Sequence, residues 1–271
     1  MTVSNADRAA ILVHALPYIK KYTGKIVVIK YGGSAMQSET LKNSVVRDVI
    51  LLHLIGVKVV LVHGGGPEIT DLLTRLGKET QFVGGLRVTD RETVEVAQMV
   101  LAGKVNKSLV NLIECSGGHA VGLCGMDGHM ISAVQKDPAL GYVGKITAVD
   151  PTPVLDLLEK GYIPVVSTLG CDDAGNVYNV NADTAAAKLA ATLHAESLIS
   201  LTDTAGQRRP LVAHLARDGR RDRAAHRRRR DRGRHAAEGG MLHRRHPRRR
   251  APRLHHRRAR AAFDPDRDAD R

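Results

Sequence analysis

Cysteine is scarce in this sequence, and that scarcity limits the kinds of site the chain can hold. Its 271 residues include three cysteines, at positions 115, 124 and 171. Their spacing matches neither a zinc-binding pattern nor a paired-thiol redox motif, so we interpret them as buried or idle thiols. We therefore predict no metal site.

Long apolar runs and targeting segments are also lacking. No stretch of about 18 apolar residues could form a membrane-spanning helix. The first residues do not form a charged segment followed by an apolar one, as an export signal would. We expect a cytoplasmic protein without a membrane partner.

The last quarter of the chain lacks several common residue types altogether. Residues 207–271 contain no Lys, Ser, Thr, Asn, Ile, Tyr or Cys, but 23 Arg and 8 acidic residues. Residues 1–206 hold 18 basic and 20 acidic residues, so the formal net charge of +13 arises entirely from this tail. A natural basic tail mixes Lys and Ser with Arg. Because its apolar residues are too few to offset the chain entropy, we expect the tail to be disordered.

Strand-like and helix-like segments alternate along the first 206 residues, which predicts a parallel α/β sheet. The apolar runs Lys25–Lys30 and Val57–His63 predict buried strands, separated by a helix over residues 39–54. Near the N-terminus, a helical apolar stripe contains Pro17, which we expect to kink or break the helix. "GHAVGLCGMDG", "YIPVVSTLG" and "SLISLTD" predict further strands, and "NADTAAAKLAATLHA" predicts a helix capped by Asn181 or Asp183.

Two glycine clusters follow the first two predicted strands, Gly32-Gly33 and Gly64-Gly65-Gly66. Ligands bind at this edge of open α/β sheets, and glycine lets backbone N–H groups approach a phosphate or carboxylate closely. Glycine pairs also end strands for structural reasons alone, and a lysine closing an apolar strand is usually an edge residue. Two clusters at one edge, the first preceded by Lys30, favour a phosphate site. Neither cluster matches a Walker loop or a dinucleotide fingerprint.

Five motifs point to one family: "VVIKYGGSAM", "VVLVHGGGPEI", "GGLRVTD", "GLCGMDG" and "YNVNADTAAAKLA". In their order and spacing, from about Ala9 to Gly206, they resemble the acetylglutamate-phosphorylating branch of the amino acid kinase family. The motifs "GLRVTD" and "NVNAD" separate this branch from the carbamate, uridylate and aspartate kinases of the same fold. Arg87 and Asn179, which lie in these motifs, disfavour a carbamate kinase.

The resemblance implies an open αβα sandwich with a mainly parallel central sheet. Residues 25–180 would form the acetylglutamate-binding lobe, and residues 181–206 would begin an ATP-binding lobe that this chain leaves incomplete. Residues 1–24 resemble the kinked N-terminal helix of the hexameric, arginine-inhibited members. The resemblance thus implies a homo-oligomer built from dimers, with arginine as a feedback inhibitor.

The implied reaction transfers the γ-phosphoryl group of ATP, bound with Mg²⁺, to the side-chain carboxylate of N-acetyl-L-glutamate, in arginine biosynthesis. Such a transfer depends on positioning and charge neutralisation more than on covalent chemistry. By the same resemblance, Lys30 would contact the phosphoryl oxygens. Backbone N–H groups around the transferred group would come from Gly32, Gly33 and Gly64.

The resemblance also implies how the substrate is held. Gly65 and Gly66 would bind it, and Arg87 would form a charge-assisted, bidentate bond with its α-carboxylate. Asn179 would bind the same end of the substrate. Asp183 would orient Lys30 and a second lysine from the other lobe.

The residues alone leave other interpretations open. Arg87 suits an exposed surface position equally well, and Asp183 suits a plain helix cap. His63 suits a general base, but the substrate carboxylate is already ionised near neutrality and needs none. We therefore interpret His63 as structural.

The tail has two interpretations. A polycationic segment binds nucleic acid through phosphate contacts, which would make the chain a non-catalytic binding lobe. Alternatively, back-translation of the tail, read one base later, permits "IADGVIAGGMLPKVEC" over residues 226–241 and "SIIDGRVPHSILIEMLT" over 254–270. Both resemble the family's C-terminal lobe, so we interpret the tail as an out-of-frame translation that starts between positions 206 and 226. This chain would then lack the second catalytic lysine and be inactive.

Overall fold

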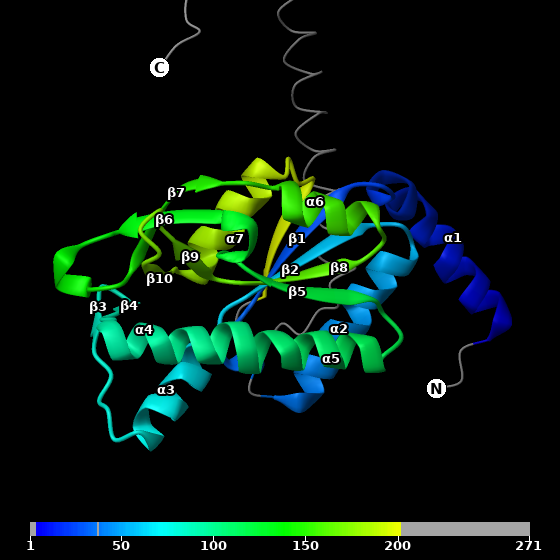
Figure 1. Ribbon diagram of the computed structural model, residues 1–271. Helices are drawn as coiled ribbons and strands as arrows, with labels where there is room; N and C mark the ends of the chain where they lie inside the picture. Colours follow the sequence, from blue (N-terminus) through cyan, green and yellow to red (C-terminus); the bar gives the residue numbers. More distant parts are fainter. Residues whose placement is uncertain (1–3, 37, 202–271) are drawn as a thin grey trace, which may run out of the picture. The chain divides into compact units, whose positions relative to one another are not determined.

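The computed structural model describes residues 4–36 and 38–201, and these form a central sheet with helices on both faces (Figure 1). Five strands are hydrogen-bonded in the order β11-β1-β2-β8-β5, and every neighbouring pair is parallel. Their bounds are β1 Ile26–Tyr31, β2 Lys58–His63, β5 Ala120–Cys124, β8 Ile163–Ser167 and β11 Ser197–Leu201. The mainly parallel α/β sheet predicted from the sequence is confirmed.

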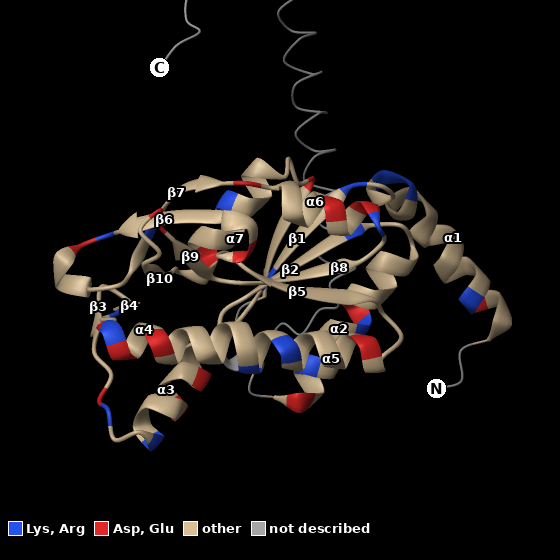
Figure 2. Cartoon of the chain, in the orientation of Figure 1, with Lys and Arg blue, Asp and Glu red and all other residues tan. Residues whose placement is uncertain are grey.

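Helices cover this sheet on both faces, which is why its strands are almost uniformly apolar. One face packs against α2 (Glu39–Leu54), α3 (Gly66–Arg75), α4 (Arg91–Gln98) and α5 (Asn106–Cys115). The other packs against α6 (Thr152–Glu159) and α7 (Ala182–Thr192). Within the five strands the charged residues are Lys58, where β2 begins, and Lys30, next to the end of β1 (Figure 2).

A π-helix, η2, joins α4 to α5 over Met99–Val105. Such segments are rare and frequently lie at functional sites. Its residues Leu101 and Val105 are buried in the same core as α3 and the central strands. The segment therefore supports the region where β2 turns into α3.

A second, four-stranded sheet has the order β10-β9-β6-β7 and lies beside the first (Figure 1). Its strands are β6 Ile131–Gln135, β7 Gly144–Val149, β9 Leu169–Cys171 and β10 Val177–Asn179. Outside the two sheets, β3 (Phe82–Val83) and β4 (Leu86–Arg87) form a short hairpin. Three 3-10 helices complete the described elements: η1 Gly33–Met36, η3 Asp127–His129 and η4 Pro138–Leu140.

The N-terminal helix α1 runs from Asn5 to Tyr22 with Pro17 inside it. Of the two outcomes predicted at Pro17, a kink or a break, the continuous helix leaves the kink, which stays a prediction. A proline removes one backbone hydrogen bond, and the other turns of an 18-residue helix hold the element together.

The predictions about the lobe boundary and the Arg-rich tail are not tested by the described residues. The division into lobes at residue 180 stays a prediction, and the Arg-rich tail, 207–271, lies outside the described residues. Across residues 4–36 and 38–201, every helix is too short or too polar to span a bilayer.

Candidate functional site

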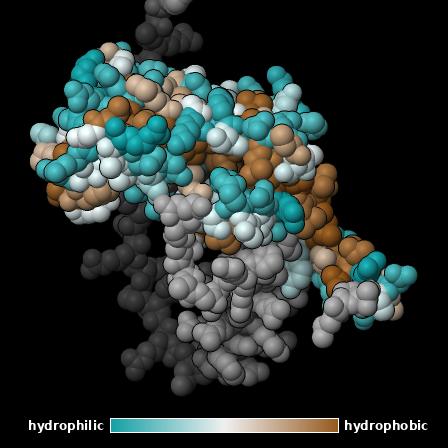
Figure 3. Space-filling view, turned by 90° about the horizontal axis from the view of Figure 1, so that it is seen from below, coloured by the Kyte–Doolittle hydropathy of each residue, from teal (hydrophilic) through white to brown (hydrophobic). Residues whose placement is uncertain are grey.

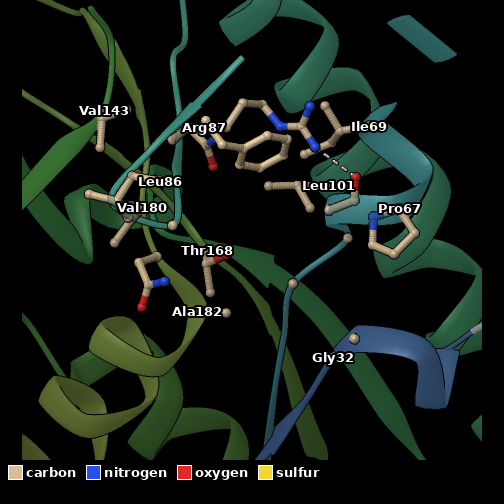
Figure 4. Close-up of a pocket in the computed structure, with 18 of the residues that line it drawn as sticks. Gly32, Pro67, Ile69, Leu86, Arg87, Leu101, Val143, Thr168, Val180 and Ala182 are labelled. Carbon is tan, nitrogen blue, oxygen red and sulfur yellow. Dashed lines mark hydrogen bonds between the residues drawn. The ribbon is translucent and has the colours of Figure 1, made fainter. Parts of the chain in front are cut away.

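A cavity of about 250 Å³ opens where β1 and β2 end (Figure 4). The register of the two strands places Lys30 beside Val62 and Tyr31 beside His63, so the glycine turns that follow them lie together. Among the predicted site residues, those lining the cavity are Lys30, Gly32, Gly33, Gly64, Gly65, Gly66, Arg87 and Asn179. The fold thus brings residues that lie up to 149 positions apart in the chain to the same cavity.

Lys30 forms an ion pair with Asp183, with 3.1 Å between Nζ and Oδ1. The lysine side chain is 11% exposed and the aspartate 65%. Asn181, rather than Asp183, caps α7, because its side chain accepts a hydrogen bond from the Thr184 N–H at 3.0 Å. This cap leaves the Asp183 carboxylate available to hold the ammonium group at the cavity.

The two glycine turns are in direct contact. The Gly64 N–H donates to the Tyr31 carbonyl at 3.2 Å, so the predicted bond from Gly64 to a phosphoryl oxygen stays a prediction. A Cβ atom on Gly32 would lie 3.3 Å from the Lys30 side chain. Gly33 has a φ of 74°, a conformation that favours glycine.

Gly65 caps the N-terminus of α3, with Pro67 in the first turn. The first N–H groups of a helix have no intrahelical acceptor, and the helix dipole makes this end electropositive. Because Gly65 and Gly66 line the cavity, this end of α3 is suited to an anion.

Arg87 is 7% exposed and held on three sides. Its Nη2 donates to the Gly66 carbonyl at 2.9 Å and to Thr70 Oγ1 at 2.7 Å, and its guanidinium lies 4.7 Å from the centre of the Phe82 ring. Its buried Nη1 has no hydrogen-bond partner among the described residues. Burial lowers the pKa of Arg87. A buried donor without a partner is costly, so this atom favours an acceptor from a ligand.

Asn179, in β10, lines the cavity from the four-stranded sheet, and its backbone N–H donates to the Tyr142 carbonyl at 2.9 Å. Several lining residues were not predicted from the sequence, among them Thr168 and Leu101. Thr168 directly follows β8, and its place at a strand end could have indicated it. Leu101 comes from the π-helix, which no sequence pattern indicated.

His63 is fully buried and is not among the residues that line the cavity. Its Nδ1 lies 2.8 Å from the Gly64 carbonyl oxygen. Burial lowers the pKa of His63 to about 4, so the ring is neutral at physiological pH. Groups of three or more His, Cys, Asp or Glu side chains that could hold a metal are absent from the described part of the chain.

A family model described as the amino acid kinase family matches residues 25–206. An acetylglutamate kinase from Brachyspira hyodysenteriae is 56% identical over 206 residues, which are 75% of this chain and 72% of that protein. One from Gloeobacter violaceus is 54% identical over 209 residues, covering 75% of this chain and 69% of that protein.

Solved structures agree on the fold. N-acetylglutamate synthase from Neisseria gonorrhoeae, complexed with coenzyme A and N-acetyl-glutamate, has a TM-score of 0.64 at 29% identity. That match covers 75% of this chain and 47% of the synthase chain. Carbamate kinase from Giardia lamblia bound to AMP-PNP, at 19% identity and a TM-score of 0.50, is similar in fold alone, over 67% of this chain and 72% of that one.

Proposed function

The chain belongs to the amino acid kinase family, and we propose that its cavity binds N-acetyl-L-glutamate for phosphorylation of the side-chain carboxylate by ATP. One observation carries this proposal. Two cationic side chains line the cavity: Arg87, whose buried Nη1 has no hydrogen-bond partner among the described residues, and Lys30, which pairs with Asp183. A dicarboxylate with a phosphorylated end matches a cavity lined by two cationic groups.

Arg87 binds the α-carboxylate in this proposal. Phe82 and Thr70 fix the guanidinium plane, and Nη1 can bind a ligand without losing a bond to the protein because it has no partner among the described residues. Asn179 binds the same end of the substrate, and the N–H groups of Gly65 and Gly66 hold it at the start of α3. The charge-assisted bond and the electropositive helix end both favour an anion.

Lys30 neutralises the transferred phosphoryl group, whose charge is spread over three oxygens in the transition state. Asp183 keeps the ammonium group at the cavity. The backbone N–H groups of Gly32, Gly33 and Gly64 donate hydrogen bonds to the phosphoryl oxygens, and the Gly64 N–H gives up its bond to the Tyr31 carbonyl to do so. ATP with Mg²⁺ is the co-substrate. The acceptor carboxylate is ionised at neutral pH, so the site needs no general base.

The N-terminal helix is proposed to be an oligomer contact, and arginine a feedback inhibitor that binds beside it. Apolar side chains of α1 are exposed to solvent: Ile11 by 61%, Leu12 by 66%, Val13 by 63% and Leu16 by 47%. Helix α1 projects from the other described elements (Figure 1), and Figure 3 shows apolar side chains along this projection. A sedimentation mass matching a dimer alone would count against this proposal.

The Arg-rich tail is proposed to be an out-of-frame translation. Sequencing the gene across codons 204–226 tests it, and an uninterrupted original frame there would refute it. We expect the 271-residue chain to bind acetylglutamate without phosphorylating it, since its ATP-binding lobe would be incomplete.

A protein with the tail re-framed tests the reaction itself. It should form an acyl phosphate, trapped with hydroxylamine, when supplied with acetylglutamate and MgATP. Lys30→Met should lower kcat by about 10²–10³, the typical cost of one preorganised transition-state donor. A re-framed protein without turnover, or a Lys30→Met variant with full turnover, contradicts the proposal.

A further inference from the structure

A buried polar cluster lies directly behind the Gly64–Gly65 turn. It consists of His63, at the end of β2, and Asn106, the first residue of α5, whose side chains are 0% and 1% exposed. The Asn106 Nδ2 atom lies 3.1 Å from His63 Nε2, 2.8 Å from the Val165 carbonyl oxygen and 3.2 Å from the Leu123 carbonyl oxygen. An asparagine from a covering helix thus spans three neighbouring strands, β2, β8 and β5.

Space for this asparagine is made by Gly122 in β5. A Cβ atom at that position would overlap the Asn106 Oδ1 atom and lie 2.7 Å from Lys107 Nζ. Glycine weakens the interior of a strand, so the close approach of the Asn106 side chain is the physical reason for a glycine at position 122. The sheet is therefore shaped to admit the Asn106 amide.

The cluster sets the protonation of the His63 ring. The carbonyl oxygens of Val165 and Leu123 can only accept, so the atom of the Asn106 amide beside His63 Nε2 is the nitrogen, which does not accept a hydrogen bond. His63 Nε2 must then carry no proton, and Nδ1–H donates to the Gly64 carbonyl at 2.8 Å. A protonated ring would place an Nε2–H against the Asn106 amide donor.

The next carbonyls of the turn are also engaged. The Gly65 carbonyl accepts from the Ile69 N–H at 2.9 Å, and the Gly66 carbonyl accepts from Arg87 Nη2 at 2.9 Å. The Gly65 N–H, in contrast, has no acceptor among the described residues. Because the C=O and N–H of a trans peptide point in opposite directions, fixing the Gly64 carbonyl toward His63 turns the Gly65 N–H away from it.

We infer that His63 is a positioning residue: held in its Nδ1–H tautomer by Asn106, it fixes the Gly64–Gly65 peptide so that the Gly65 N–H faces the anion in the cavity. This inference rests on the proposed function, in which Gly65 binds acetylglutamate. Without the His63 bond the peptide is able to rotate, and its carbonyl oxygen would then repel a carboxylate.

Two substitutions at His63 distinguish the bond from Nδ1 to the Gly64 carbonyl from the contact of Nε2 with Asn106. His63→Asn places an amide nitrogen near the position of Nδ1 and keeps the bond to Gly64, whereas His63→Gln places its amide near Nε2 and loses that bond. In calorimetric titrations of the 271-residue chain with N-acetyl-L-glutamate, His63→Asn should bind within about threefold of wild type, and His63→Gln about tenfold or more weakly. The matched substitutions His119→Asn and His119→Gln, at an exposed histidine, should leave the affinity unchanged.

A second measurement needs no ligand. Nitrogen-15 NMR of the histidine rings should show His63 protonated at Nδ1 and unprotonated at Nε2, and Asn106→Ser should yield a mixture of tautomers. Equal affinities of the two His63 variants, or a wild-type ring protonated at Nε2, would overturn the inference. If the wild-type chain binds no acetylglutamate, the proposed function fails, and the ring spectra alone then decide this inference.

Discussion

Gly65 offers the sharpest test of how the anion-binding turn is packed. A Cβ atom on Gly65 would lie 2.7 Å from Leu101 Cδ2 and 3.3 Å from Val105 Cγ2, both in the π-helix. Leu101 is 1% exposed, so it cannot move aside without disturbing the core. Gly65 has a φ of 173°, which any residue adopts, so this contact is the physical reason for glycine here.

We therefore expect Gly65→Ala to lower the free energy of unfolding by about 1–3 kcal/mol, the usual cost of overpacking. Gly66→Ala is the matched control. Its Cβ would meet nothing within 4 Å, so alanine at this first position of α3 should not lower the free energy of unfolding. Urea unfolding followed by far-ultraviolet circular dichroism measures both, since the chain has no tryptophan for fluorescence.

A double-mutant cycle identifies the contact. Leu101→Val removes the colliding methyl group, so Gly65→Ala should cost less in that background, with a coupling energy of about 1 kcal/mol. Strictly additive costs would show that Leu101 is not the obstacle. A Gly65→Ala variant as stable as Gly66→Ala would refute the packing argument altogether.

Three further predictions concern charge and hydrogen bonding. The pKa of His63 is about 4 in the folded chain and 6.5 when the ring is exposed, so the unfolded chain binds more protons between these two pH values. The free energy of unfolding should therefore fall by about 3 kcal/mol as the pH drops from 6.5 to 4. His63→Asn should remove this part of the dependence of stability on pH. Asp90 caps α4, and its carboxylate lies 2.6 Å from the Lys78 ammonium, which lowers the pKa of Asp90 to about 2. The stabilisation of the folded chain by the ionised Asp90 should therefore be complete above pH 3.8 and be lost as the pH falls through 2. In thermal unfolding, Asp90→Ala should cost about 1 kcal/mol, and Asp90→Asn, which keeps the cap, less. Thr70→Val should weaken acetylglutamate binding about tenfold by releasing Arg87 Nη2, with little change in Tm, and an unchanged affinity would contradict that role.

The sheet and most of the site were predictable because they follow from local patterns. Apolar runs set β1 and β2, and a glycine cluster after each parallel strand must lie at the same sheet edge. From the residues alone, Asp183 could equally be a helix cap. The structure shows that Asn181 takes the cap and Asp183 pairs with Lys30, a distinction that depends on a contact 153 positions away in the chain.

Other features were not predictable because they arise from tertiary packing. The π-helix that carries Leu101 has no distinctive sequence pattern, and the role of Asn106 depends on the space that Gly122 leaves in another element. Pro17 left a kink and a break both open, because the local rule does not include the length of the surrounding helix. These features depend on the surrounding fold rather than on local sequence patterns.

Calorimetric titration of the 271-residue chain with N-acetyl-L-glutamate, beside Arg87→Met, tests the central claim most directly. We expect saturable binding at one site, weakened about tenfold or more when the guanidinium is replaced, because Nη1 supplies a charge-assisted bond. Wild-type protein that binds no acetylglutamate, or an Arg87→Met variant that binds it equally well, would contradict the account.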